Sequence, residues 1–207
     1  VAAAAGTGFV FVEGNAELTP ARLAGQFDPS RVLEDGYTPD VFVDGPLVEA
    51  LRHGSLLYVE ELNRVPEETV NLLITVMSEG ELTLPRLGTI SAAGGFRLVA
   101  AMNPFDNIGT ARVSGAVYDR MCRIAMGYQS LDDESDIVVR NTSEDDRVLR
   151  RRAVAVTRGT RNHPDVRVGS SVRGAIDLVE VGHALASMRS AQVTDPSVGL
   201  DAALTAL

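Results

Sequence analysis

Short apolar runs alternate with amphipathic segments along the first 128 residues of the chain. Three of these runs are rich in strand-forming residues and predict buried strands, at Phe9–Val12, Leu56–Val59 and Phe96–Met102. Two segments between the runs predict helices: Pro46–Arg52, with proline at its first position, and Pro66–Ser78, with its apolar residues on one face. Because strands alternate with helices, we expect a parallel α/β sheet.

Other stretches of this half have weaker patterns. Residues Ala16–Phe42 mix Gly, Pro and Asp with short helical pieces and are expected to form a long irregular insertion. Alternating apolar residues around a proline and a glycine predict a β-hairpin over Glu81–Ile90. A short helix is expected over Ser114–Met121, and a fourth strand is expected to begin at Arg123–Met126.

The pattern changes near Gln129. From Asp132 onward the chain consists of acidic and basic helical segments without a strand signal. One helix shows an apolar stripe with spacings of three, four and three residues, formed by Leu178, Val181, Leu185 and Met188. We therefore expect an α/β domain over residues 1–128 and a helical domain over residues 129–207.

Composition and charge exclude some classes of protein. The chain has 207 residues, of which 45% are hydrophobic and 23% charged, so a folded core is expected rather than disorder. The formal net charge is −9, which argues against a nucleic-acid partner. The basic run Arg150–Arg152 is accordingly predicted to be a solvated helix face.

Cysteine and histidine usage argues against a metal centre of the zinc type. The only cysteine, Cys122, lies in an apolar run and is expected to be a buried, inert thiol, and the three histidines are scattered. No apolar run is long enough for a membrane span, and the first basic residue is Arg22, so no signal peptide is recognised. A cytoplasmic location follows by elimination. The chain lacks an initiator Met and stops inside an apparent helix, so both ends look cut.

The strand at Leu56–Val59 ends in two adjacent carboxylates, Glu60 and Glu61. Ligands of open α/β sheets bind at the carboxyl ends of the strands. One carboxylate there could hold Mg²⁺, directly or through water, and the next could orient a water that attacks a phosphate. The alternative is a solvated strand end followed by a loop.

Three further polar residues could belong to the same chemistry. Asn103 follows the third strand, where its amide could hold the attacking water or a terminal phosphate, although a turn residue before proline is common. Arg120 follows a Gly-rich stretch and could stabilise charge on a transferring phosphoryl group, or form a surface ion pair. Arg173 would project from the first turn of a helix capped by serine, as a ligand of phosphate or as a solvated charge.

The order and spacing of these motifs resemble the AAA+ ATPases, with the MoxR branch and the magnesium-chelatase type nearest. The resemblance covers roughly residues 9 to 190. The segment Leu56–Pro66 resembles the Walker B segment of that family, in which Asp-Glu is the usual acid pair and Asn-Arg follows shortly. In this chain Glu60 stands where the family has Asp.

The resemblance implies a role for each candidate residue. Glu60 would hold Mg²⁺ and Glu61 would be the catalytic glutamate for ATP hydrolysis. Asn103 would be sensor 1, Arg120 the arginine finger that acts on a neighbouring subunit's nucleotide, and Arg173 sensor 2. The fold implied is an incomplete parallel-sheet P-loop NTPase core followed by a helical lid domain. The insertion and the hairpin look like the helix-2 insert and the hairpin before sensor 1.

One motif of the family is absent. No G-x-x-x-x-G-K-[ST] occurs in the sequence, and Gly6-Thr7-Gly8 lacks the lysine and the remaining glycines. In the family this Walker A loop lies upstream of the position of Val1, so truncation is favoured over natural loss. The fragment is expected to bind ATP poorly, because the amides and the lysine that cradle the phosphates are missing.

Three functions remain open. The first is an oligomeric ATPase, with a hexameric ring expected, that remodels a protein client; in the family such ATPases often work with a partner carrying a von Willebrand A domain. The second is the motor subunit of a metal chelatase, and the third is a non-hydrolysing assembly module. A transcription activator of the superfamily is disfavoured because its Gly-Ala-Phe-Thr-Gly-Ala loop is absent.

Overall fold

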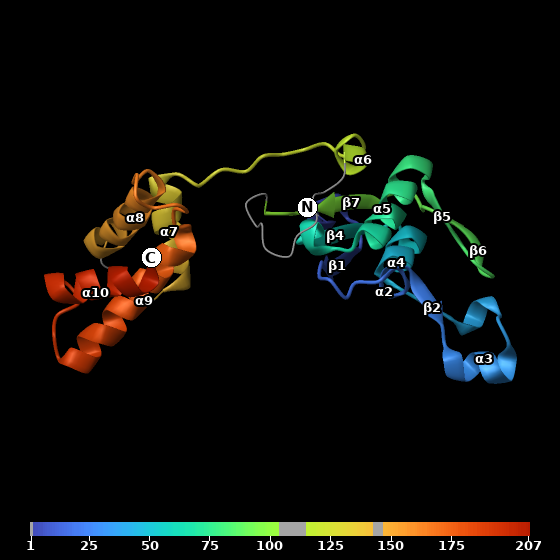
Figure 1. The fold of residues 1–207 in the computed structure, drawn as a ribbon, viewed down its shortest axis with the longest axis horizontal. Coiled ribbons are helices and arrows are strands. Elements are labelled where there is room, and N and C mark those ends of the chain that lie inside the picture. Colours follow the sequence, from blue (N-terminus) through green and yellow to red (C-terminus); the bar gives the residue numbers. More distant parts are fainter. Residues whose placement is uncertain (1, 104–114, 143–146) are drawn as a thin grey trace. The chain divides into compact units, whose positions relative to one another are not determined.

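The computed structural model describes residues 2–103, 115–142 and 147–207 and divides the chain into two compact units, Val1–Ile124 and Ala125–Leu207 (Figure 1). A short helix, α1 (Ala2–Ala5), opens the first unit. Its centre is a three-stranded parallel sheet with the order β1 (Phe9–Glu13), β4 (Leu56–Glu60) and β7 (Arg97–Ala100). The three predicted strands and their parallel arrangement are confirmed.

Two helices connect these parallel strands, as predicted. Helix α4 (Pro46–His53) begins with proline at its first turn and ends at Gly54, which adopts the left-handed conformation that glycine tolerates. Helix α5 (Glu67–Glu79) has two glutamates in its first turn, where the helix dipole favours negative charge. Figure 1 shows both helices beside the sheet.

One face of the sheet packs against the core of the first unit. Val12, Leu57 and Val59 point into the core shared with α4 and α5, and the latter two are completely buried. On the opposite face Phe9 and Phe11 are 57% and 50% exposed. The prediction of buried strands is therefore right for β4, wrong for every second residue of β1, and wrong for β7, in which no residue is fully buried. An apolar run shows that a residue prefers burial, but it does not show whether both faces of a strand are covered.

The insertion is more regular than expected. It contains α2 (Pro20–Ala24), β2 (Gly25–Phe27), α3 (Pro29–Asp35), a 3₁₀ turn at Pro39–Val41 and β3 (Phe42–Asp44). Strands β2 and β3 pair antiparallel, and the rings of Phe27 and Phe42 pack edge to face with centroids 5.1 Å apart. Strands of three residues are too short to show an alternating pattern, so the sequence gives no signal for this pairing.

The predicted hairpin is confirmed as β5 (Glu81–Leu84) and β6 (Gly88–Ser91). Arg86 in its turn has a positive φ of 67°, and its guanidinium lies 3.7 Å from the centroid of the Tyr37 ring. This cation–π contact joins the hairpin to the insertion.

The end of the first unit differs from expectation. The short helix is present as α6 (Gly115–Tyr118) within the described residues. The fourth strand predicted at Arg123–Met126 is wrong, because this segment is neither strand nor helix and Ile124 and Met126 are exposed. Cys122 is exposed as well, so the predicted buried thiol is wrong. An alternating apolar pattern makes a strand only where a neighbouring strand can pair with it.

The second unit contains four helices among its described residues: α7 (Leu131–Asn141), α8 (Arg147–Arg161), α9 (Val172–Arg189) and α10 (Pro196–Ala206). The amphipathic helix predicted from Leu178 onward is α9, but its most buried positions include Ala175, Val179 and Ala186 rather than the predicted stripe. Small residues are buried there because they allow neighbouring helices to approach closely. No helix in the described part of the chain is both long and apolar enough to cross a bilayer.

Candidate functional site

The carboxyl ends of the three parallel strands meet at one edge of the sheet. Glu13 and Glu60 are register partners at the ends of β1 and β4. After β4 the chain remains close to the segment that follows β7, because the Leu62 amide donates to the Ala101 carbonyl at 3.0 Å. The structure thus brings the backbone around Glu60 and Glu61 next to the segment that ends in Asn103, as the sequence predicted.

Glu61 has an unusual backbone conformation. Its φ of 51° and ψ of 44° place it in the left-handed region, which is uncommon for residues other than glycine. Such a conformation costs on the order of 1–3 kcal/mol and persists where the surrounding structure enforces it. It turns the chain sharply away from the strand immediately after Glu60.

The Glu61 carboxylate is only partly paired. Its Oε2 atom lies 3.4 Å from Arg64 Nε, and the same oxygen makes no hydrogen bond among the described residues. A buried acceptor without a hydrogen bond is costly, so native structures rarely leave one without a reason. An acceptor in this position fits a group that orients a water molecule.

Glu60 is exposed at the very end of β4. No group of three or more His, Cys, Asp or Glu residues in the described ranges is placed to hold a metal ion. A single carboxylate nevertheless fits Mg²⁺, which usually keeps several waters and is bound by one or two carboxylates together with substrate phosphates. Glu60 therefore suits an ion that arrives with a phosphate-bearing ligand, and not an all-protein cage.

Gly14 allows the acid pair to sit where it does. The Gly14 amide donates to the Glu60 carbonyl at 2.8 Å. A Cβ atom at this position would collide with the Glu61 carbonyl oxygen and would lie 2.8 Å from that of Glu60. Both obstacles are backbone atoms, which cannot rotate out of the way. The glycine is required because the chain after β1 crosses closely over the end of β4.

Asn63 is a residue of the site that the sequence did not single out. It is only 6% exposed, and its Nδ2 donates to the Asn103 carbonyl at 3.4 Å. Its Oδ1 is buried and has no hydrogen-bond partner among the described residues. Asn63 thus contacts the backbone of Asn103 from the segment that follows the acid pair. The Asn-Arg pair that follows the two acids was the signal that could have identified it.

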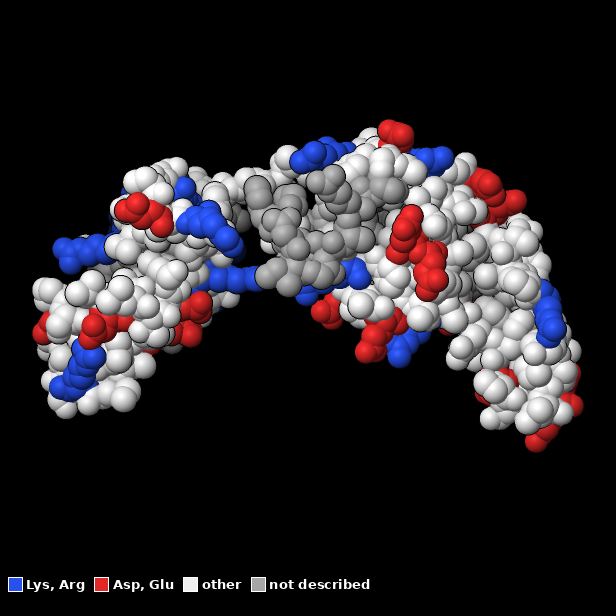
Figure 2. Space-filling view, in the orientation of Figure 1, with Lys and Arg blue, Asp and Glu red and all other residues white. Residues whose placement is uncertain are grey.

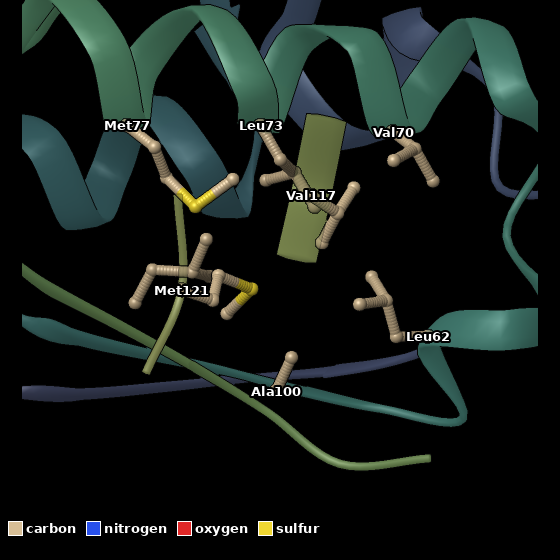
Figure 3. Close-up of a pocket in the computed structure, with 8 residues that line it drawn as sticks. Leu62, Val70, Leu73, Met77, Ala100, Val117 and Met121 are labelled. Carbon is tan, nitrogen blue, oxygen red and sulfur yellow. The ribbon is translucent and has the colours of Figure 1, made fainter. Parts of the chain in front are cut away.

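The apolar layer behind the acid pair is shown in Figure 3. Side chains from α5, β7, α6, the turn after β4 and the segment after α6 surround a narrow gap; they are Leu62, Val70, Leu73, Met77, Leu98, Ala100, Val117 and Met121. The lining has no polar side chain, so this gap contributes packing and no chemistry. It anchors Leu62, the residue that follows Glu61, to α5.

Arg120 contacts the carboxyl-terminal end of α5. Its Nε donates to Ser78 Oγ at 2.6 Å and its Nη1 donates to the Ala116 carbonyl at 2.9 Å. The residue is exposed, yet its guanidinium is held by its own subunit. A role on a neighbouring subunit's nucleotide stays a prediction.

Arg173 belongs to the second unit, where it lies exposed in the first turn of α9. Ser171 caps this helix, and its Oγ accepts from the Arg173 amide at 3.3 Å. The predicted cap is confirmed, whereas the contact of Arg173 with nucleotide stays a prediction.

On the face drawn in Figure 2, acidic and basic side chains of the described residues are interspersed over both units.

Comparison with known proteins identifies the family. The sequence pattern of the AAA domain (dynein-related subfamily) matches residues 1–121. The chain belongs to this AAA family. The gas vesicle ATPase GvpN1 of Halobacterium salinarum is 28% identical over 202 residues, which cover 90% of this chain and 58% of that protein. An uncharacterized protein of Staphylococcus saprophyticus is 29% identical over 174 residues, covering 81% and 66% of the two chains.

Solved structures agree on the fold. The AAA chain aligns with the RuvB P216G mutant of Thermotoga maritima at a TM-score of 0.54 and 14% identity, covering 97% of this chain and 54% of RuvB. It aligns with NtrX of Brucella abortus at a TM-score of 0.56 and 17% identity, covering 88% and 40%. The predicted AAA+ α/β fold is confirmed. The chain spans 58% and 66% of the lengths of the two relatives named above.

Proposed function

We propose that the whole protein containing this chain hydrolyses ATP and uses the energy to remodel or assemble a protein partner, as a member of the MoxR branch. The observation that carries this proposal is Glu61, held in a left-handed turn after a buried parallel strand, with a carboxylate oxygen that is ion-paired with Arg64 and makes no hydrogen bond among the described residues. Because the chain belongs to the AAA family, this geometry supports a role for Glu61 in ATP hydrolysis.

In the proposed reaction Glu61 orients a water molecule and accepts its proton as the water oxygen attacks the terminal phosphorus of ATP. The bond from that phosphorus to the bridging oxygen of ADP breaks as the new bond forms. Glu60 would hold Mg²⁺, which when bound neutralises charge on the phosphate oxygens. Asn103 would hold the water or the terminal phosphate through its amide. Asn63 would keep Asn103 in place.

The phosphate-binding loop is not among the residues of this chain. The sequence contains no lysine at all, so the lysine of such a loop has no counterpart here. Because the chain spans about two thirds or less of the relatives it matches, we propose hydrolysis for the whole protein and weak ATP binding for this chain alone. The gas vesicle relatives are named as ATPases, which supports hydrolysis over the non-hydrolysing assembly module.

A protein client is supported by the insertion. Leu33 on α3 is 88% exposed, Val43 on β3 is also exposed, and Arg86 of the hairpin stacks on Tyr37 of the insertion. Exposed apolar residues on the insertion suit contact with another polypeptide. A homo-oligomeric ring, with a hexamer expected, a partner with a von Willebrand A domain and a cytoplasmic location belong to the same proposal. The unit Ala125–Leu207 would be the helical lid, with Arg173 as sensor 2.

A subunit-mixing experiment tests both the ring and Arg120. Arg120→Ala and Glu61→Gln subunits of the whole protein should each be inactive alone. In a mixed ring, an interface that joins an intact Glu61 to a neighbour's intact Arg120 should hydrolyse ATP, so activity should return at intermediate ratios. If mixed rings form, shown by native mass spectrometry, and no ratio regains hydrolysis, Arg120 does not act in trans.

A further inference from the structure

The helical unit contains a cluster of three charged side chains around one buried carboxylate. Glu134 on α7 is 1% exposed. Its Oε2 accepts from Arg158 Nη1 at 2.9 Å, and its Oε1 forms an ion pair with Arg161 Nη2 at 2.7 Å. The Arg161 side chain is itself only 8% exposed. One buried carboxylate is thus shared by two arginines from α8.

Stability alone is a weak reason for such a cluster. Taking charges out of water costs several kcal/mol per ion, and well-packed apolar residues of similar volume are often as stabilising or more so. The contacts that the two arginines make beyond Glu134 suggest another role. Both guanidinium groups reach out of the α7–α8 pair to other segments of the chain.

The first of these segments lies near the start of the helical unit. Arg158 Nη1 also donates to the Gln129 carbonyl at 2.9 Å. The Arg161 guanidinium lies 3.9 Å from the centroid of the Tyr128 ring, in cation–π geometry. The two arginines therefore fasten residues 128 and 129 to α8.

The second segment is the loop that starts α9. Arg161 Nε donates to the Ser170 carbonyl at 2.8 Å, and the Ser170 amide donates to Thr160 Oγ1 at 2.9 Å. Gly169 lies so close to Arg161 that a Cβ atom there would collide with the Arg161 backbone. The Tyr128 hydroxyl donates to the Gly169 carbonyl at 3.5 Å.

We propose that Arg161, held by Glu134, is a positioning residue for Arg173. It fastens the start of α9 to residues 128–129, so that Arg173 keeps one direction relative to the segment that enters the helical unit. Ser170 is hydrogen-bonded to Arg161 and Thr160. The next residue, Ser171, caps the turn that carries Arg173. A planar guanidinium suits this task because its nitrogens point in fixed directions toward separate acceptors. The inference rests on the proposed contact of Arg173 with nucleotide.

The test uses Arg161→Lys in the whole protein. This substitution keeps the positive charge but removes the planar guanidinium. Arg151→Lys on the same helix is the control, since Arg151 pairs with the exposed Asp132. We expect Arg161→Lys to raise the KM for ATP several-fold and to speed hydrogen exchange of the amides at residues 170–174, with the melting temperature retained. The control should change none of these. Thr160→Val, which removes the acceptor for the Ser170 amide and the hydrogen bond that the hydroxyl donates to the Thr157 carbonyl, should shift exchange in the same direction by less.

A double mutant separates positioning from a general structural role. If Arg161 acts through Arg173, then Arg161→Lys should add nothing to the KM of Arg173→Ala. Additive effects, or unchanged exchange at residues 170–174 in both Arg161→Lys and Thr160→Val, would overturn the positioning role. If Arg173→Ala leaves the KM for ATP unchanged, the nucleotide role of Arg173 is wrong. The exchange data would still test whether Arg161 holds the start of α9.

Discussion

Two glutamates of this chain, Glu61 and Glu134, occupy opposite environments. Glu61 follows β4 in a left-handed conformation, and its side chain is 33% exposed with one ion pair, to Arg64 at 3.4 Å. Glu134 is buried within a helical unit and is shared by two arginines. A partly exposed carboxylate with a single long ion pair at a sheet edge is available for chemistry. A carboxylate whose charge is fully compensated is committed to holding other groups.

The largest stability effect is expected at Glu134. Glu134→Leu leaves Arg161 buried without its counter-ion, so unfolding of the helical unit should become easier by about 3–5 kcal/mol. Asp132→Leu on the same helix removes only an exposed ion pair and should cost less than about 1 kcal/mol. Urea denaturation followed by circular dichroism measures both. Equal losses in the two variants would remove the contrast between the cluster and an ordinary surface pair.

Gly14→Ala should affect both stability and activity. The added methyl group meets the carbonyl oxygens of Glu60 and Glu61, so the turn that carries the acid pair must shift. We expect a loss of about 1–3 kcal/mol, as for other overpacking substitutions, together with a clear fall in ATP turnover. Gly94→Ala is the matched control, because a methyl group there meets open space. If Gly14→Ala behaves like the control, the close crossing does not position the acids.

The smallest effect on stability is expected for substitutions at Glu60. Glu60→Asp restores the residue usual in the family and should keep or raise ATPase activity, because Mg²⁺ tolerates a water between itself and a carboxylate. Glu60→Ala should weaken the Mg²⁺ dependence and slow hydrolysis. A Mg²⁺ titration of the ATPase rate decides the matter. A Glu60→Ala curve that overlays the wild type in midpoint and maximum would remove Glu60 from the metal site.

Local patterns in the sequence predicted most of the first unit. The apolar runs and the helix between two of them, Pro46–Arg52, identified the sheet and its crossovers, because a short apolar run between turn residues is typical of a buried strand. The adjacent acids after Val59 identified the candidate site. The predicted strand at Arg123–Met126 is wrong because no partner strand pairs with that pattern in the described structure.

Features that depend on distant contacts could not be predicted. Glu134 is one of several acids in the segment Leu131–Asp136, and nothing local distinguishes it from its solvated neighbours. Its burial follows from two arginines more than twenty residues later. The same holds for Asn63, whose partner Asn103 lies forty residues away. The left-handed turn at Glu61 also escapes prediction, because no glycine stands at that position.

Turnover of Glu61→Gln in the whole protein tests the central claim most directly. Glutamine keeps the shape of the side chain but cannot accept the proton of water, so ATP hydrolysis should fall by about 10²–10⁴-fold. ATP binding and the melting temperature should be retained, because Glu61 contributes only a partly exposed ion pair to the fold. A turnover equal to that of the wild type would contradict the assignment of Glu61 as the catalytic glutamate.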